Sequence, residues 1–317
     1  FTGSKSHNIR LREMAMKRGL KINEYGVFDQ KTDKKIAGKE EKDIYRVLDL
    51  PDIHPELRED MGEIEAAIRG DLPKLVKIKD IKGDLHVHSK WSDGSHTLEE
   101  LAIAAKERGY EYLAITDHSK SLGIARGLTK EALLEMKKEV ISLNKRLRGV
   151  RLLAGTEVNI RSDGTIDYPD EVLSKLDIVV AAIHSGFRQD KEQMTKRVVM
   201  AMKNPFIHII AHPTGRLLGE REGYELDIDL VLKTAKETNT ALEINGYPLR
   251  LDLNDINSKK AKELGVSLVI STDAHVISQL DYIENGVKVA RRGWLSKNDI
   301  LNTLPWEKLK KKIAKTM

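Results

Sequence analysis

Seven short apolar runs alternate with amphipathic stretches between residues 83 and 272, and this alternation constrains the fold more than any other feature of the 317-residue chain. Repeated strand–helix units form parallel sheets, because a crossover helix returns the chain to the start of the next parallel strand. The predicted strands are Gly83–Val87, Tyr112–Thr116, Arg151–Val158, Ile178–Ile183, Ile207–Ala211, Ala241–Asn245 and Leu268–Thr272. The predicted helices between them include Leu98–Arg108, Lys130–Leu147, Lys191–Met202, Ile228–Thr238 and Asn257–Leu264.

Residue types that bind metal ions stand at or just beyond the ends of these runs. They include six of the ten histidines in the chain. The full set is His86, His88, Asp93, His118, Glu157, His184, His212, Asp273 and His275. In a barrel the strand ends form a ring, so these side chains can converge, whereas in an open sheet the ends spread into a line. The sequence therefore predicts an α/β fold with a (β/α)7 TIM-like barrel and a metal site at its mouth.

The nine residues together are stronger evidence for a metal site than any one of them alone. His86 and His88 alternate on one strand and so face the same side, but a single histidine at a strand end is usually structural. Asp117 orients a ligand or caps its loop, and the sequence leaves both readings open. A glutamate inside an apolar run, as at Glu157, is costly unless it is paired or bound to a metal.

Nine ligands are too many for one ion, so we expect two to three divalent ions, with zinc, manganese and iron as candidates. The chain has no cysteine, which excludes disulfides and thiolate ligands. Such a cluster suits hydrolysis of phosphate esters, because the ions bind phosphate oxygens and lower the pKa of a bridging water.

Cationic and amide side chains in the same loops are candidates for binding phosphate, for which the planar fork of arginine is suited. They are Lys120, Arg126, Arg216, Asn245 and Arg250. Each cation taken alone reads more readily as a solvated surface group, and only the group as a whole indicates a phosphorylated substrate. The net charge of +5 permits an anionic substrate but does not require one.

The first 72 residues follow a different pattern, and we predict three parts: residues 1–72, a linker at 73–82 and a barrel domain at 83–317. The first part reads as a helix, two strands and a charged helix, at Asn8–Lys17, Lys21–Phe28, Gln30–Ile36 and Glu40–Leu48. The basic tail from Lys308 reads as a solvated helix face. We expect no membrane span, because no apolar run is long enough to cross a bilayer. The start at Phe1 suggests a fragment of a longer protein.

The ligand motifs resemble those of the polymerase and histidinol phosphatase (PHP) family. They are His86-x-His88, Ser92-Asp93-Gly94, Thr116-Asp117-His118, Glu157, His184, Ala211-His212-Pro213 and Asp273-Ala274-His275. The resemblance implies a distorted seven-stranded barrel with three ions. It implies that His86, His88, Glu157 and Asp273 hold the first ion, and that Glu157, His184 and His212 hold the second. Asp93, His118 and His275 would hold the third. Glu157, Asp273 and His275 would be catalytic, together with a metal-bound hydroxide.

Residues 1–26 resemble the thumb region of family X DNA polymerases, in which Phe1, Gly3 and Asn8 would contact the incoming nucleotide. The two resemblances together imply the C-terminal part of a bacterial or archaeal family X polymerase, located in the cytoplasm with the nucleoid. They imply DNA as partner, with 3′–5′ exonuclease, 3′-phosphatase and abasic-site endonuclease activity in DNA repair. The polymerase's palm carboxylates are not among these residues. A small-molecule phosphatase of the histidinol type and a non-catalytic structural module are the alternatives.

Overall fold

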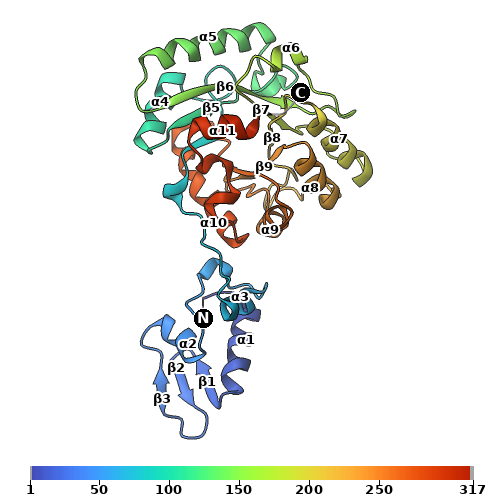
Figure 1. Cartoon of the computed structure of the whole chain (residues 1–317). Helices are drawn as coiled ribbons and strands as arrows, with labels where there is room; N and C mark the ends of the chain where they lie inside the picture. The colour runs from blue at the N-terminus through green and yellow to red at the C-terminus, as the bar shows by residue number, and fades with distance from the viewer. Residues whose placement is uncertain (1, 315–317) are drawn as a thin grey trace. The chain divides into compact units, whose positions relative to one another are not determined.

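The computed structural model describes residues 2–314 and divides the chain into two compact units, Phe1–Lys74 and Leu75–Met317 (Figure 1). The first unit is a small α+β structure with a three-stranded antiparallel sheet. Its elements are α1 (Lys5–Met16), β1 (Leu20–Asn23), β2 (Gly26–Asp29), β3 (Lys35–Ala37), α2 (Glu41–Val47), the 3₁₀ turn η1 (Pro55–Leu57) and α3 (Glu63–Arg69).

The prediction of one long strand at Lys21–Phe28 is wrong, because a tight turn divides it. The side chain of Asn23 accepts a hydrogen bond from the backbone N–H of Tyr25 at 2.9 Å, which reverses the chain. Gly26 follows with φ of +138°, a conformation that side-chain-bearing residues rarely adopt. The first helix also begins earlier than predicted, since Ser4 caps it by accepting from the N–H of His7 at 3.1 Å.

The second unit contains seven parallel strands in the order β10-β9-β8-β7-β6-β5-β4, so each strand pairs with its neighbour along the chain. The strands are β4 (Gly83–Val87), β5 (Tyr112–Ile115), β6 (Arg151–Asn159), β7 (Ile178–Ala182), β8 (Ile209–Ile210), β9 (Ala241–Asn245) and β10 (Leu268–Ser271). The α-helices are α4 (Leu98–Glu107), α5 (Lys130–Arg146), α6 (Asp170–Leu173), α7 (Lys191–Lys203), α8 (Ile228–Glu237), α9 (Asp255–Leu264), α10 (Ile283–Arg292) and α11 (Trp306–Ile313). Short 3₁₀ turns complete the unit: η2 (Ile78–Asp80), η3 (Gly123–Ala125), η4 (Ile277–Tyr282), η5 (Lys297–Asp299) and η6 (Leu301–Thr303).

The sheet curves into a nearly closed barrel because its first and last strands meet. A parallel bridge joins Val87, at the end of β4, to Ala274, just beyond β10. The N–H of His88 donates to the Ala274 carbonyl at 2.8 Å, and the N–H of Asp273 donates to the His86 carbonyl at 3.0 Å. The predicted fold is therefore confirmed, and the barrel closes at the positions of predicted metal ligands.

Helix α11 closes the barrel at the end opposite the ligands. Its apolar residues Trp306, Leu309 and Ile313 are buried in the same cluster as the inward-facing side chains of the strands. Trp306 packs against Tyr112, the first residue of β5, with ring centroids 6.1 Å apart. The lysines on its other face are exposed, as the sequence predicted, but the buried face was not foreseen.

Within residues 2–314, none of the helices combines the length and the apolar character that a membrane crossing requires. The residues predicted as a linker are partly structured. Leu75 pairs with Ser296, and Val76 is fully buried, so from Leu75 onward the chain belongs to the barrel unit.

Candidate metal centre

Glu157 stands at the centre of the nine predicted ligands. It lies on β6 with 1% of its surface exposed. Its Oε2 lies 2.8 Å from Nδ1 of His118, 3.4 Å from Nε2 of His86 and 3.6 Å from Nε2 of His88. Its Oε1 lies 3.1 Å from Nε2 of His212 and 3.2 Å from Nε2 of His184. Each carboxylate oxygen thus faces a different group of imidazoles.

The two aspartates extend the cluster. Oδ1 of Asp273 is 3.1 Å from Nε2 of His88 and 3.6 Å from Nε2 of His86. Oδ2 of Asp93 is 3.4 Å from Nε2 of His275 and 3.6 Å from Nε2 of His118. All nine predicted residues therefore meet at one end of the barrel. The side chains of Asp93 and His275 are 28% and 33% exposed, so the cluster opens to solvent on their side.

The donor atoms form three groups whose members lie within 4.8 Å of one another. The groups are His88, Asp93, His118 and His275; His86, His88 and Asp273; and His118, Glu157 and His184. The predicted trio Asp93, His118 and His275 lies inside the first group. The third group contains His118 where the prediction placed His212, although Nε2 of His212 also lies next to Glu157.

The cluster has the chemistry of a metal site. Four of its buried nitrogens and one oxygen make no hydrogen bond: Nε2 of His86, Nδ1 of His88, Nδ1 of His118, Nδ1 of His212 and Oε2 of Glu157. An ion with four ligands at about 2.0–2.1 Å holds ligand atoms about 3.3 Å apart, which matches most separations in the cluster. Buried polar atoms without hydrogen bonds are costly, so the donor set fits divalent ions.

Electrostatics hold the carboxylates ionised. Burial opposes the charge of Glu157, but the charges of His184, His118 and His86 outweigh it and hold the pKa of Glu157 well below its ordinary range. Burial and the neighbouring charges of His118 and His275 lower the pKa of His88 to about 3. An ionised carboxylate and a neutral imidazole are the forms that bind metal ions, so Glu157 and His88 are held in the binding form. Although burial opposes it, nearby carboxylates raise the pKa of His86 and His118, so a metal ion bound there would displace a proton.

Buried partners outside the predicted set orient the ligands. Glu243 of β9 accepts a hydrogen bond from Nδ1 of His86 at 2.8 Å and another from the N–H of His212 at 2.7 Å. Nδ1 of His184 lies 2.5 Å from the side-chain oxygen of Asn159. Such contacts fix the ring orientation and leave Nε2 facing the metal site. The sequence analysis missed Glu243, although a glutamate within an apolar strand is the signal that identified Glu157.

Backbone strain occurs at two of the predicted ligands. His212 has φ of +29° and Asp273 has φ of +56°, in the left-handed region that residues other than glycine rarely adopt. Strain of this kind costs on the order of 1–3 kcal/mol for each residue and collects at functional sites. Asp117, whose role the sequence left open, follows β5 but holds the neighbouring loop after β4. Its carboxylate accepts hydrogen bonds from the hydroxyls of Ser89 and Ser92, both at 2.6 Å.

The predicted phosphate-binding residues are placed differently from one another. Arg250 lies at the cluster, with Nε 3.5 Å from Oδ2 of Asp273, and its side chain is 18% exposed. Asn245 is buried and donates to Asp273 at 3.3 Å. Arg216 donates to the backbone carbonyls of Arg250 and Leu251 and so supports the Arg250 loop. Two further predicted residues, Lys120 and Arg126, are exposed on the loop after β5.

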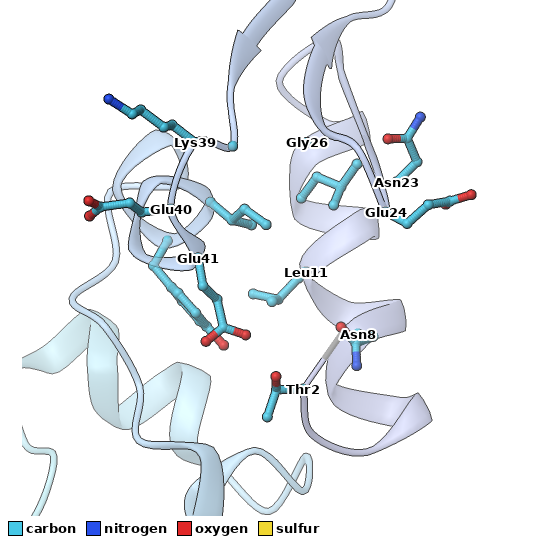
Figure 2. Close-up of a pocket in the computed structure, with 13 residues that line it drawn as sticks. Thr2, Asn8, Leu11, Asn23, Glu24, Gly26, Lys39, Glu40 and Glu41 are labelled. Carbon is cyan, nitrogen blue, oxygen red and sulfur yellow. The ribbon is translucent and has the colours of Figure 1, made fainter.

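The predicted nucleotide-binding residues lie in the first unit, and Phe1 falls outside the described residues. Gly3 has φ of +107°, and a Cβ there would lie 2.6 Å from Cβ of Arg58, so glycine has a structural reason at this position. Asn8 lines a pocket opposite Glu41, shown in Figure 2. The charged side chains of that pocket are three glutamates and one lysine, which disfavours a nucleotide's phosphates. These roles stay a prediction.

Comparisons with known proteins agree with the fold and the ligand motifs. The model of the DNA polymerase beta thumb matches residues 1–59, and the model of the PHP domain matches residues 84–246. The chain therefore belongs to the PHP family and carries a thumb segment ahead of the PHP domain. These two matches confirm both resemblances seen in the sequence.

Two relatives are similar to this chain in sequence, and one solved structure is similar to it in fold. The DNA polymerase/3′-5′ exonuclease PolX of Bacillus subtilis (strain 168) is 48% identical over 302 residues, which are 95% of this chain and 53% of that protein. The chain thus spans about half the length of that relative. A protein of Thermoanaerobacter sp. (strain X514) named "probable phosphatase" is 32% identical over 231 residues, covering 69% of this chain and 89% of the relative. A crystal structure from Listeria monocytogenes, described as a "putative histidinol phosphatase", shares the fold, with a TM-score of 0.52 and 16% identity over 63% of this chain and 97% of that one.

Proposed function

We propose that the barrel unit is a metal-dependent phosphoesterase that processes DNA ends. The observation that carries the proposal is the position of Glu157, whose two carboxylate oxygens face five histidines in two groups. A carboxylate in that position suits a bridge between ions, and clusters of bridged ions are typical of phosphate ester hydrolysis. DNA as the substrate is supported by the thumb segment and by the name of the B. subtilis relative.

We assign the nine predicted ligands to two or three divalent ions, of zinc, manganese or iron. Ions bound there would supply Lewis acidity toward a phosphoryl oxygen and make a water easier to deprotonate. The catalytic assignment of Glu157, Asp273 and His275 is part of this proposal. His275 is the most open of the three, and hydrogen bonding to Asp93 raises its pKa to about 9 against the effect of burial.

The surrounding residues of the chain would position the substrate. Arg250 would bind a phosphate oxygen, since its guanidinium lies at the edge of the cluster and remains partly exposed. Arg216 would support it through the backbone carbonyls of its loop. We assign Lys120 and Arg126 to more distant phosphates of a polymeric substrate, and Asn245 to the orientation of Asp273.

The finer activities belong to the same proposal. They are 3′–5′ exonuclease, 3′-phosphatase and abasic-site endonuclease activity, acting in DNA repair in the cytoplasm of a prokaryote. The full-length parent would be a DNA polymerase in which Phe1, Gly3 and Asn8 contact the incoming nucleotide. The 317 residues alone should not synthesise DNA.

The test is digestion of a 5′-labelled single-stranded oligonucleotide in the presence of Mn²⁺. The wild type should shorten it from the 3′ end, and the double variant His88→Ala plus Asp273→Ala should lose the activity by a factor of 10³ or more. His54→Ala is the matched control, because it removes an exposed histidine of the first unit. Equal digestion by the wild type and the double variant would refute the proposal.

A small-molecule phosphatase is the second candidate, and the Thermoanaerobacter relative of 32% identity favours it. Hydrolysis of histidinol phosphate by the wild type, without action on DNA ends, would establish this alternative. A non-catalytic module is the third candidate. It would be recognised by elemental analysis of protein purified without chelator, as less than about one bound ion per chain.

A further inference from the structure

Two loops next to the metal ligands form a cleft with an unusual combination of side chains. The first loop follows β7 and His184, and the second follows β8 and His212. The cleft has a volume of about 570 Å³, which is within the usual range for small-ligand sites. It is lined by Gly186, Phe187, Arg188, Arg221, Glu222, Gly223 and Tyr224.

Aromatic rings and guanidinium groups lie together in this cleft. The rings of Phe187 and Tyr224 are nearly parallel, with 17° between their planes and 6.2 Å between their centroids. The guanidinium carbon of Arg221 lies 4.1 Å from the centroid of the Phe187 ring. Arg188 is exposed beside them. The two arginines outnumber the one glutamate of the lining, so the cleft has a positive balance of charge.

Buried contacts hold the second loop in place. The backbone N–H of Tyr224 donates to the carbonyl of Thr214 at 3.0 Å. Nη2 of Arg221 donates to the carbonyl of Gly215 at 2.7 Å. Gly215 has φ of +62°, and a Cβ there would lie 2.4 Å from Cε1 of Tyr224. The ring therefore packs against the backbone only three residues from His212.

An equally rigid arrangement holds the first loop. Arg197 of α7 is 1% exposed and donates from Nη1 to the carbonyl of Ser185 at 2.9 Å. Its Nε donates to the carbonyl of Ile160 at 3.1 Å, which ties the loop to the end of β6. Phe187 lies two residues after Ser185 and is partly exposed. Hydrogen bonds within the barrel unit thus support both walls of the cleft.

We propose that this cleft binds the nucleobase next to the scissile phosphodiester, with the Phe187 ring and the Arg221 guanidinium that lies over it as the stacking platform, and with Arg188 beside the backbone phosphates. The inference rests on the proposed function. It adds a binding site for the base, because the metal centre would contact only the phosphate. Aromatic rings stack on any base, and arginines pair with phosphate, so the cleft selects nucleotides over aliphatic phosphate esters without selecting sequence. Another mouth aromatic, Trp91, is less suited, because its ring N–H donates to the carboxylate of Glu139 at 2.9 Å.

The test compares two oligonucleotides that differ only in whether the 3′-terminal residue carries a base or is abasic. The wild type should prefer the base-bearing end by about tenfold or more in kcat/KM. Phe187→Leu should lose that preference, so that its kcat/KM on the base-bearing end falls to about its kcat/KM on the abasic end. Phe187→Trp should restore the preference. Phe206→Leu is the matched control, because Phe206 is a partly buried ring that precedes β8, at the other end of the strand.

A binding measurement separates stacking from turnover. A terminal 2-aminopurine should lose fluorescence on binding to the Asp273→Asn protein, and the loss should disappear when Phe187→Leu is added. An unchanged preference in Phe187→Leu, or unchanged quenching, would overturn the cleft assignment and leave the proposed function standing. Failure of the wild type to cleave either oligonucleotide would refute the DNA activity, and this inference with it.

Discussion

Replacing Glu243 by glutamine should weaken metal binding at the position held by His86, although the change is nearly isosteric. Three donors converge on this buried carboxylate. They are Nδ1 of His86 at 2.8 Å, the N–H of His212 at 2.7 Å and Nδ2 of Asn245 at 3.1 Å. A glutamine offers one acceptor oxygen in place of two, so its NH₂ group must face at least one of these donors.

The size of the effect follows from these contacts. A hydrogen bond to a charged group contributes about 1.5–3 kcal/mol, and loss of a carboxylate that orients a metal-binding histidine typically costs 10–100-fold in metal affinity. That range corresponds to about 1.4–2.7 kcal/mol. We expect Glu243→Gln to fall within it. Glu243→Gln should also slow phosphoester hydrolysis at a metal concentration that saturates the wild type.

The assay is competition for Zn²⁺ between the protein and a chromophoric chelator at neutral pH, with circular dichroism as the check on folding. Glu237→Gln is the matched control, because Glu237 is exposed on α8 and lies 4.0 Å from Lys233. An affinity for Glu243→Gln within threefold of the wild type, with the fold intact, would show that Glu243 does not orient His86 for metal binding.

Three further predictions concern other parts of the chain. His7 is buried, with its Nδ1 2.5 Å from the carboxylate of Glu63 and its Nε2 3.0 Å from the hydroxyl of Tyr45. His7→Leu should therefore lower the unfolding free energy of the first unit by roughly 3 kcal/mol. Amide exchange should become faster in α1 and stay unchanged in the barrel. Burial raises the pKa of Asp252 to about 6 from an ordinary 3.8, so its contribution to stability is full below pH 3.8 and is lost as pH rises through 6. Asp252→Asn should therefore remove a decline on the order of 3 kcal/mol between pH 4 and 7, and equal slopes of urea midpoint against pH would contradict the burial argument. Arg250→Gln should raise the KM for phosphoester substrates about tenfold and weaken inhibition by inorganic phosphate equally, and an unchanged KM would exclude a phosphate contact.

The strands, the barrel helices and the nine convergent residues could be predicted because their signals are local. Apolar runs mark strands within a few residues, and a ligand at the end of each run needs only the parallel arrangement to reach its neighbours. The same reasoning failed at β1 and β2, where the turn at Glu24–Tyr25 depends on the side chain of Asn23. It also failed at α11, where the run of lysines drew attention to the exposed face. The apolar residues between those lysines are buried in the barrel core.

The sequence by itself determined the order of strands and helices, the set of candidate ligands and the absence of thiolate ligands from these 317 residues, since each depends on single residues or short periods. Only the tertiary structure decided how the ligands are held. Glu243 and His86 are 157 residues apart, and their hydrogen bond exists because β4 and β9 belong to the same barrel. The two predicted ligands with positive φ, His212 and Asp273, are likewise held by residues distant in the sequence, since their N–H groups donate to Glu243 and to the His86 carbonyl.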